Sequence, residues 1–304
     1  MRKINGLICA PFTAFDEKGN VDLDKVAEQA RFYKDNGIRG VFACGTTGEG
    51  SSLTIPEKKA LFKRWAGQKD DNFAVIAFLG GTSVRDCIDL ALYSQELGLD
   101  AVAMTGPYYQ KAACLKDLAL TLAEVAAAVP DMPFYYYHIP VLTHVNFSMS
   151  ALLKEVDGKI PNFAGIKYTF EDMMDYQMCL EFGNRKYNIL WGRDEMFLEA
   201  LSIGADSFIG STYGYSAPIY LEIKKAFEEG DIRRAASLQY EANRMIELLG
   251  KYGNGSGKAF MKASGLDLGP CRRPLQTLEG EKYAAFIRDL ASTRFTEFQN
   301  TLKE

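Results

Sequence analysis

Short runs of β-branched and aromatic residues alternate along the chain with longer segments in which apolar residues recur every three or four positions, as far as about residue 229. The short runs predict strands and the longer segments predict amphipathic helices. The predicted strands are 7–14, 40–44, 73–79, 101–105, 133–137, 163–167, 188–191 and 207–210. The predicted helices are 22–36, 56–67, 83–97, 115–128, 148–156, 171–182, 195–203 and 217–229.

This alternation predicts an α/β fold, because helices that link successive strands make those strands parallel. Eight such units in roughly 225 residues fit a closed (β/α)₈ TIM barrel, with an open doubly wound sheet as the alternative. After Asp231 only helical patterns remain, over 231–253 and 280–299. The sequence therefore predicts a barrel over 1–229 and a C-terminal helical extension over 230–304, packed on the barrel or on another subunit.

The amino-acid composition and net charge limit the kinds of macromolecule that the protein is expected to bind. The chain of 304 residues is 47% hydrophobic and 24% charged, with a formal net charge of −4. These values are typical of a soluble globular protein, and they argue against nucleic acid or an anionic membrane as partner, since both are usually met by a basic surface. No apolar run is long enough to span a membrane, and no signal peptide is evident.

The cysteines and histidines indicate the redox state of the cellular compartment and whether a metal site is expected. The six cysteines show no CxxC pair or disulfide-like spacing, so each is expected to be a small buried hydrophobe in a reducing, cytoplasmic environment: Cys9, Cys44, Cys87, Cys114, Cys179 and Cys271. The two histidines, His138 and His144, belong to no HExxH or Cys/His cluster. No metal site is predicted.

The strand at 163–167 ends on a lysine instead of a turn residue. Barrel enzymes carry their chemistry at the C-terminal ends of strands. Alternation puts Lys167 on the same side as Gly165 and Phe163, with Ile166 and Ala164 opposite. If that side is the interior, partial desolvation lowers the pKa of the amine and favours attack on a carbonyl. The alternative is a lysine that simply leaves the strand for solvent.

The preceding strand offers a partner for this amine. Tyr135 and Tyr137 share one face, while Phe134 and Tyr136 face the helices. Tyr137 stands at the end of its strand, and because neighbouring strands lie about 4.8 Å apart, its phenol and the Lys167 amine can meet one reacting carbon. An aromatic stripe alone is more typical of core, which is the expected role of Tyr135 and Tyr136.

Two loops carry further polar candidates. The stretch CGTTGEGSS after the second strand has neither dinucleotide nor P-loop spacing, but the hydroxyls of Thr46 and Thr47 suit a small anion such as a carboxylate. A flexible turn is the alternative. In WGRDEMF, Asp194 and Glu195 can accept hydrogen bonds from a polyhydroxy substrate. Their alternatives are a helix N-cap and a first-turn acid that the helix dipole favours.

The motifs GTTGE, PYY at 107–109, YYYHIP, GIKYT, GRDE and GSTY occur in one order along nearly the whole chain. As a set they resemble the N-acetylneuraminate lyases of the dihydrodipicolinate synthase and pyruvate-dependent class I aldolase superfamily, over roughly residues 5–295. The resemblance implies a TIM barrel with a helical extension, a homotetramer, and a Schiff-base lyase that cleaves sialic acid to pyruvate and N-acetylmannosamine without metal or cofactor.

The resemblance also implies a role for each candidate residue. Lys167 would form the Schiff base, Tyr137 would relay a proton, and Thr46 and Thr47 would hold the pyruvyl carboxylate. Tyr109 matches a tyrosine that reaches a neighbouring subunit's site. The sugar portion would be bound at five positions: Thr169, Gly192, Asp194, Glu195 and Ser211.

One position separates branches of the superfamily. Dihydrodipicolinate synthases carry an arginine two residues after the proline of the YYYHIP motif, where this chain has Leu142. A hydroxylated sugar needs no such cation. Two alternatives stay open: an aldolase that acts on another 2-keto-3-deoxy sugar acid, and a barrel that binds sialic acid or pyruvate without turnover.

Overall fold

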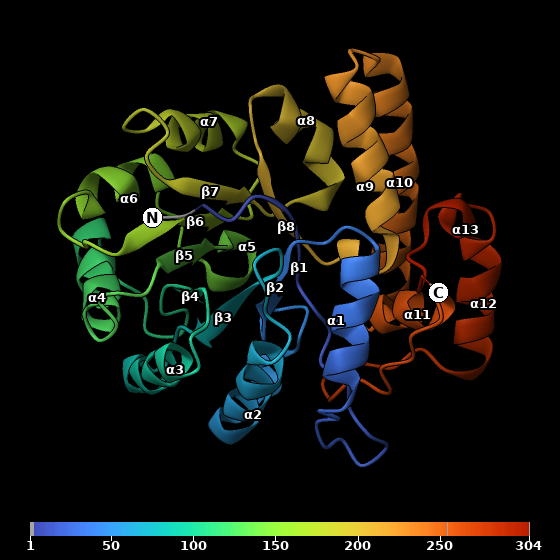
Figure 1. Ribbon diagram of the computed structural model, residues 1–304, viewed down its shortest axis with the longest axis horizontal. Coiled ribbons are helices and arrows are strands. Elements are labelled where there is room, and N and C mark those ends of the chain that lie inside the picture. The colour runs from blue at the N-terminus through green and yellow to red at the C-terminus, as the bar shows by residue number, and fades with distance from the viewer. Residues whose placement is uncertain (1–2, 254, 304) are drawn as a thin grey trace.

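A computed structural model of the protein describes residues 3–253 and 255–303, in which parallel strands close into one barrel. Each strand pairs with the next, and β1 pairs with β8 to complete the ring (Figure 1). The strands are β1 (Gly6–Cys9), β2 (Gly40–Ala43), β3 (Ala74–Gly80), β4 (Ala101–Met104), β5 (Phe134–His138), β6 (Phe163–Tyr168), β7 (Asn188–Trp191) and β8 (Ser207–Gly210). The predicted TIM barrel is confirmed.

Helices surround the ring in the predicted alternation. Those that follow the strands are α1 (Lys25–Asp35), α2 (Ile55–Ala66), α3 (Val84–Glu96), α4 (Leu115–Ala127), α6 (Met149–Val156), α7 (Met173–Glu181), α8 (Phe197–Ser202) and α9 (Tyr213–Glu228). Short helical segments lie in three loops: η1 (Gly50–Ser52) and α5 (Pro140–Thr143), which were not predicted, and η2 (Asp194–Met196), which overlaps the predicted helix 195–203. At the start of α2, the Thr54 hydroxyl accepts from the Glu57 amide and the Glu57 carboxylate accepts from the Thr54 amide, which together form a capping box.

Side-chain alternation sorts the strand residues into two layers. Tyr135 and Tyr137 lie with Ile8, Phe42 and Leu190 in the barrel interior. Phe134 and Tyr136 belong to the layer between strands and helices, as predicted. The first strand is shorter than the predicted 7–14, because it ends at Cys9. Two residues later the chain reaches Pro11, which has no amide hydrogen to donate to a strand ladder.

Strand β6 departs from strict alternation. In its pairing with β5, Phe163 lies opposite Phe134 but Gly165 lies opposite Tyr135, so Ala164 is an extra residue. Such a bulge turns the side chains before it to the other face. Phe163 therefore packs under the helices and Ala164 faces the interior, the reverse of the prediction. Beyond the bulge, Ile166 faces outward as predicted.

The helices after α9 pack on the barrel of the same chain. They are α10 (Ile232–Tyr252), α11 (Ser256–Ala263), α12 (Gly280–Leu290) and α13 (Phe295–Phe298). Helix α10 lies along α9, and the others lie outside it (Figure 1). Asn300 donates to the carbonyls of Tyr213 and Gly214 at 2.9 Å and accepts from the Ala217 amide at 2.8 Å, across the kink of α9 at Ser216. This contact supplies partners to the backbone groups that the kink exposes.

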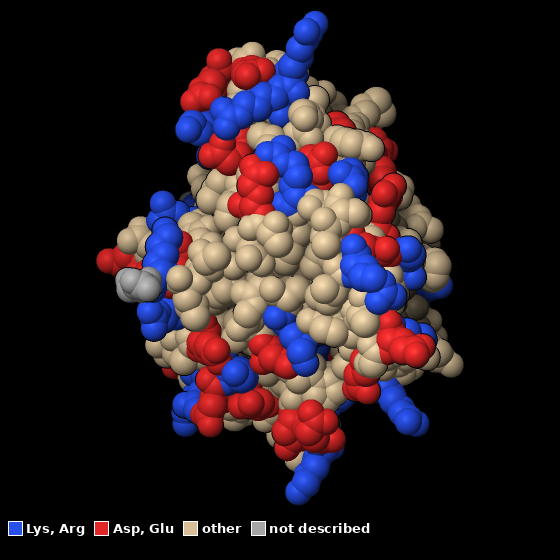
Figure 2. Space-filling view, turned by 90° about the vertical axis from the view of Figure 1, so that its right-hand side faces the viewer, with Lys and Arg blue, Asp and Glu red and all other residues tan. Residues whose placement is uncertain are grey.

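On the side of α12 and α13, positive and negative side chains are interspersed around an uncharged centre (Figure 2). None of the described helices is long and apolar enough to cross a membrane.

Four of the cysteines are buried as predicted: Cys9, Cys44, Cys87 and Cys179. Burial was wrongly predicted for two others: Cys114, at the exposed start of α4, and Cys271, which is half-buried.

Gly165 is expected to be essential to the β6–β7 pairing, because an added Cβ would lie 1.8 Å from the Asn188 carbonyl oxygen. Gly165→Ala should lower the free energy of unfolding by about 3 kcal/mol, as overpacking does in a tight core. Gly250→Ala is the matched control, since its Cβ meets nothing within 4 Å. Urea unfolding measures both variants, and equal midpoints would contradict the role assigned to Gly165.

Candidate active site

Lys167 stands near the end of β6 with its side chain inside the barrel. Its backbone lies opposite that of Tyr137 on β5. The Nζ atom is 4.0 Å from the centroid of the Tyr137 ring and 4.1 Å from that of Phe42. Only 4% of the residue is exposed. The predicted interior position of the lysine is confirmed, and the alternative of a lysine that leaves for solvent is wrong.

Burial controls the protonation of this amine. Loss of hydration disfavours the ammonium form and lowers the pKa of Lys167, while the Tyr137 phenol and, more weakly, Asp194 oppose the shift. In the described part of the chain, no carboxylate forms a salt bridge with the amine. A larger fraction of Lys167 is therefore neutral near pH 7 than for a surface lysine, which suits a nucleophile.

Phe42 and Tyr137 contact the amine, and Phe78 packs on both of these rings. We call the three rings the aromatic cage. Their centroids lie 5.3 to 5.6 Å apart, with Tyr137 meeting both other rings edge to face. Phe42 and Phe78 were missed as candidates. Alternation along 40–44 and 73–79 places both inside the barrel, but a sequence pattern does not show which interior rings surround the lysine.

The turn after β2 presents the two predicted hydroxyls. Thr46 is exposed and Thr47 half-exposed, and with Ser211 they line a cavity of about 370 Å³ between the barrel and the C-terminal helices. Lys167 and Tyr137 do not line this cavity. The structure thus brings Thr46, Thr47 and Ser211 together, while the amine and the phenol are buried in the barrel interior.

We call residues 44–50 the hydroxyl turn. The Glu49 amide donates to the Thr46 carbonyl at 3.0 Å, and Thr13 donates to the Gly48 carbonyl at 2.6 Å. Gly50 packs so closely that a Cβ there would lie 1.8 Å from the Cys44 carbonyl oxygen. These contacts favour a fixed turn over a flexible one.

A second cavity of about 490 Å³ lies beside the first. Thr46 and Leu142 line both cavities, and Phe78 of the aromatic cage lines the second. Leu142 is largely exposed. An apolar side chain therefore stands where the resemblance places the arginine of dihydrodipicolinate synthases.

Thr169 and Gly192 lie in direct contact beyond the ends of β6 and β7. A Cβ on Gly192 would lie 2.1 Å from the Thr169 hydroxyl oxygen. That oxygen is buried, and no described residue forms a hydrogen bond with it. An unsatisfied buried hydroxyl costs about 1–3 kcal/mol, so a ligand that bonded it would recover part of this cost.

The carboxylate of Asp194 is buried between β8 and α9. Its Oδ2 accepts from the Thr212 amide at 3.0 Å and from the Thr212 hydroxyl at 2.7 Å. Burial raises the pKa of Asp194 to about 6, although the bonds from Thr212 oppose the shift. The N-cap alternative is wrong, because Arg193 stands at the N-cap of η2 and Asp194 is the first residue of that turn. Oδ1 has no partner within the described residues.

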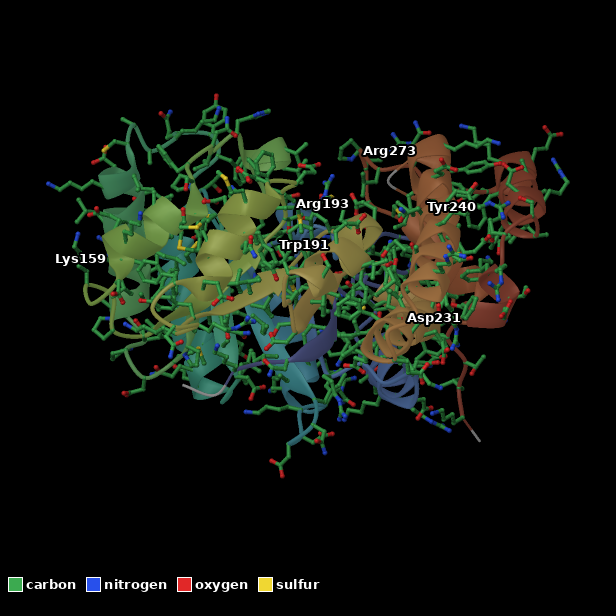
Figure 3. All side chains as sticks on the ribbon, turned by 90° about the horizontal axis from the view of Figure 1, so that it is seen from above. Lys159, Trp191, Arg193, Asp231, Tyr240 and Arg273 are labelled. Atoms are coloured by element: carbon green, nitrogen blue, oxygen red, sulfur yellow. The ribbon has the colours of Figure 1, made fainter. Side chains whose placement is uncertain are left out.

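Glu195 lies half-exposed beside Asp194 and forms an ion pair with Arg193 at 3.1 Å. Arg193 also contacts Glu171. Figure 3 shows Arg193 and Arg273 toward one edge of the molecule, with Asp231, at the start of α10, toward the other. The side chain of Gln239 in α10 donates to the Asp194 carbonyl at 3.2 Å, so the C-terminal extension holds this loop.

Tyr109 lines neither of these two cavities. It lies in the loop after β4 with 85% of its surface exposed.

The described residues form no group of typical metal ligands. In residues 3–253 and 255–303, no three His, Cys, Asp or Glu side chains are grouped so that they could hold an ion. His138 is buried, and desolvation lowers its pKa to about 4.

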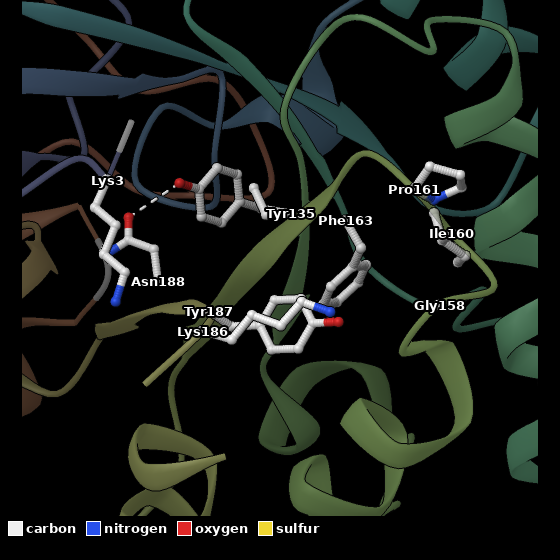
Figure 4. A pocket seen from close by; sticks show the side chains of 10 residues that line it. Lys3, Tyr135, Gly158, Ile160, Pro161, Phe163, Lys186, Tyr187 and Asn188 are labelled. Atoms are coloured by element: carbon white, nitrogen blue, oxygen red, sulfur yellow. Dashed lines mark hydrogen bonds between the residues drawn. The ribbon is translucent and has the colours of Figure 1, made fainter. Parts of the chain in front are cut away.

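A further cavity of about 170 Å³ lies at the opposite end of the barrel. It is bordered by residues that precede β1, β6 and β7, among them Lys3, Pro161 and Lys186 (Figure 4). Tyr135 donates to Asn188 there at 3.0 Å. This cavity contains none of the predicted site residues, and catalytic groups of barrel enzymes lie at the other end.

The matching family spans almost the whole chain: the dihydrodipicolinate synthetase family matches residues 3–293. The chain belongs to this family. The N-acetylneuraminate lyase of Rattus norvegicus is 35% identical over 303 residues, which cover 98% of this chain and 95% of that protein.

Solved structures agree with this family assignment. The Proteus mirabilis N-acetylneuraminate lyase superposes with a TM-score of 0.93 at 33% identity, over 97% of this chain and 100% of that one. The Aliivibrio salmonicida N-acetylneuraminate lyase superposes with a TM-score of 0.93 at 33% identity, over 97% of this chain and 98% of that one. The family resemblance and the fold predicted from the sequence are confirmed.

The pKa of Lys167 can be measured by NMR after reductive methylation of the lysines with ¹³C-formaldehyde, with its signal assigned by absence from Lys167→Met. Because burial disfavours the charged form, we expect its titration midpoint well below 10.5. Lys262, whose ion pair with Asp267 raises its pKa, is the internal control. A Lys167 midpoint at or above 10.5 would refute the desolvated amine.

Proposed function

We propose that this protein is an N-acetylneuraminate lyase, which reversibly cleaves N-acetylneuraminate to pyruvate and N-acetyl-D-mannosamine through a Schiff base on Lys167. The observation that carries the proposal is the buried lysine amine in the aromatic cage beside Tyr137, which forms no salt bridge with any described residue. Similarity to the Rattus norvegicus enzyme over nearly the full length of both chains supports the substrate.

The first stage uses the neutral amine. Lys167 Nζ attacks the C2 ketone of the open-chain sugar acid, and loss of water leaves an iminium. The aromatic cage provides no carboxylate that would hold the amine protonated. The iminium then accepts the electron pair of the C3–C4 bond as that bond breaks.

Tyr137 handles the proton of the second stage. The C4 hydroxyl gives up its proton toward Tyr137, directly or through the substrate carboxylate or a water, and N-acetylmannosamine leaves as the aldehyde. The enamine that remains takes a proton at C3, and hydrolysis of the iminium releases pyruvate and restores the amine. Neither stage requires a metal or a cofactor.

The polar groups at the barrel mouth would bind the rest of the substrate. Thr46 and Thr47 donate to the pyruvyl carboxylate from one wall of the cavity. Thr169 offers a hydroxyl to which no described residue is hydrogen-bonded, with Gly192 leaving room beside it. Asp194, Glu195 and Ser211 complete the set for the hydroxylated portion of the sugar. Leu142 favours a substrate whose far end is uncharged.

We further propose that the chain forms a homotetramer in the cytoplasm, with residues 1–229 as the catalytic barrel and 230–304 as its extension. Exposed Tyr109 would then enter a neighbouring subunit's site, and the exposed side chains of Val141 and Leu142 would be covered. Sedimentation equilibrium should give a mass near four chains. If the protein were a monomer at micromolar concentration, Tyr109 could not contribute to a neighbouring subunit's site.

The substrate is tested by the release of pyruvate, measured by lactate dehydrogenase coupling, from N-acetylneuraminate and a panel of other 2-keto-3-deoxy sugar acids. We expect N-acetylneuraminate to be cleaved with the highest kcat/KM. A higher value for another acid would identify a sister aldolase. Binding without pyruvate release from any acid would identify a non-catalytic barrel. Condensation of pyruvate with aspartate semialdehyde is the control for the synthase reaction.

Two variants separate the steps. Lys167→Met should lose both cleavage and the covalent trapping of pyruvate by borohydride, because the amine is gone. Tyr137→Phe keeps the amine, so it should still be trapped, while cleavage falls by about 10²-fold or more. Cleavage at the normal rate by Lys167→Met would exclude the Schiff base.

A further inference from the structure

The hydroxyl turn is tied to the C-terminal extension through one buried ion pair. Glu49 Oε1 lies 3.0 Å from Lys258 Nζ, with side-chain exposures of 3% and 4%. Lys258 belongs to α11, more than 200 positions away along the sequence. The contact therefore joins the wall of the cavity to a helix that lies outside the barrel.

Further bonds fix both partners of this pair. Glu49 Oε2 accepts from the Arg272 amide at 2.8 Å, and Lys258 donates to the Pro270 carbonyl at 2.6 Å. The Lys258 amine also lies 4.4 Å from the centroid of the Phe15 ring. Both oxygens of the carboxylate are thus occupied, and the turn has little freedom to move relative to α11.

The backbone at Glu49 shows that its side chain is needed. Glu49 has φ of 55°, in the left-handed region that favours glycine, and its neighbours Gly48 and Gly50 are both glycines. Strained residues persist where surrounding contacts require them. Here the carboxylate that reaches Lys258 supplies such a contact. The same residue closes the turn, through its amide bond to the Thr46 carbonyl.

We propose that Glu49 and Lys258 are positioning residues, which hold the hydroxyls of Thr46 and Thr47 where the substrate carboxylate binds. The C-terminal extension is then part of the site and not only a support for the fold. This inference rests on the proposed function, because the carboxylate belongs to pyruvate or to the pyruvyl end of the sugar acid. Leu249 and Leu275 of the extension line the same cavity.

The test measures how the rate of borohydride trapping at Lys167 depends on pyruvate concentration. In Glu49→Gln and Lys258→Met, we expect the half-saturating pyruvate concentration to rise about tenfold or more, since a misplacement near 1 Å costs up to about a hundredfold. The rate at saturating pyruvate should stay close to wild type, because the amine and the aromatic cage are unchanged. A fall in folded fraction alone would lower the maximal rate instead.

Lys262→Met is the matched control. Lys262 lies one turn further along α11, and its ion pair with Asp267 at 2.8 Å is exposed, so pyruvate saturation should not change. The double variant Glu49→Gln/Lys258→Met should show no larger rise than the worse single variant, because the two residues act through one contact. Glu49→Gln keeps the side-chain volume, so it carries the test if Lys258→Met does not fold.

The outcomes distinguish this inference from the proposed function. Unchanged half-saturation in folded Glu49→Gln would overturn the positioning role, even if its melting temperature fell. Additive effects in the double variant would also overturn it. If wild-type protein cannot be trapped at any pyruvate concentration, the Schiff-base function itself fails.

Discussion

The proposed chemistry depends on the burial of one lysine amine that forms no salt bridge with any carboxylate in the described part of the chain. The closed ring of strands removes Lys167 from water, and the aromatic cage gives it ring faces in place of hydration. Rings attract a cation only moderately, whereas loss of hydration strongly disfavours the charged form. A lysine with an adjacent carboxylate would keep its proton. The absence of such a carboxylate among the contacts of Lys167 matters as much as the presence of Tyr137.

Charged and hydrogen-bonded contacts lie around the open end of the barrel, at the C-terminal ends of the strands. There they fix the positions of loops that the strand pairing does not hold. Thr212 binds the carboxylate of Asp194, Gln239 binds the carbonyl of the same residue, and Lys258 binds Glu49. Two of these three partners come from α10 and α11. Preorganised polar groups act without rearrangement when a substrate arrives, which is a condition for efficient catalysis. The extension therefore supplies rigidity on the side where the barrel is open.

Predictions from the sequence were correct where the conformation of a residue depends only on its neighbours along the chain. Period-2 alternation placed Lys167 and Tyr137 on the strand faces that the structure shows to be interior. Alternation failed at Phe163 and Ala164, because the bulge in β6 is set by its pairing with β5. The N-cap alternative for Asp194 failed for the same kind of reason. A carboxylate binds the donor that folding brings to it, here Thr212 from the next strand's loop.

By itself, the sequence determined the barrel, the family, and the amine and phenol on adjacent strands, since these follow from periodicity and from motifs in a fixed order. Tertiary structure decided what surrounds the amine. The contact of Phe42 with it, the packing of Phe78 on Phe42 and Tyr137, and the pair of Glu49 with Lys258 join residues from separate segments. Desolvation is the physical reason: the pKa of a lysine depends on how completely other parts of the chain exclude water, and no local pattern of residues specifies that.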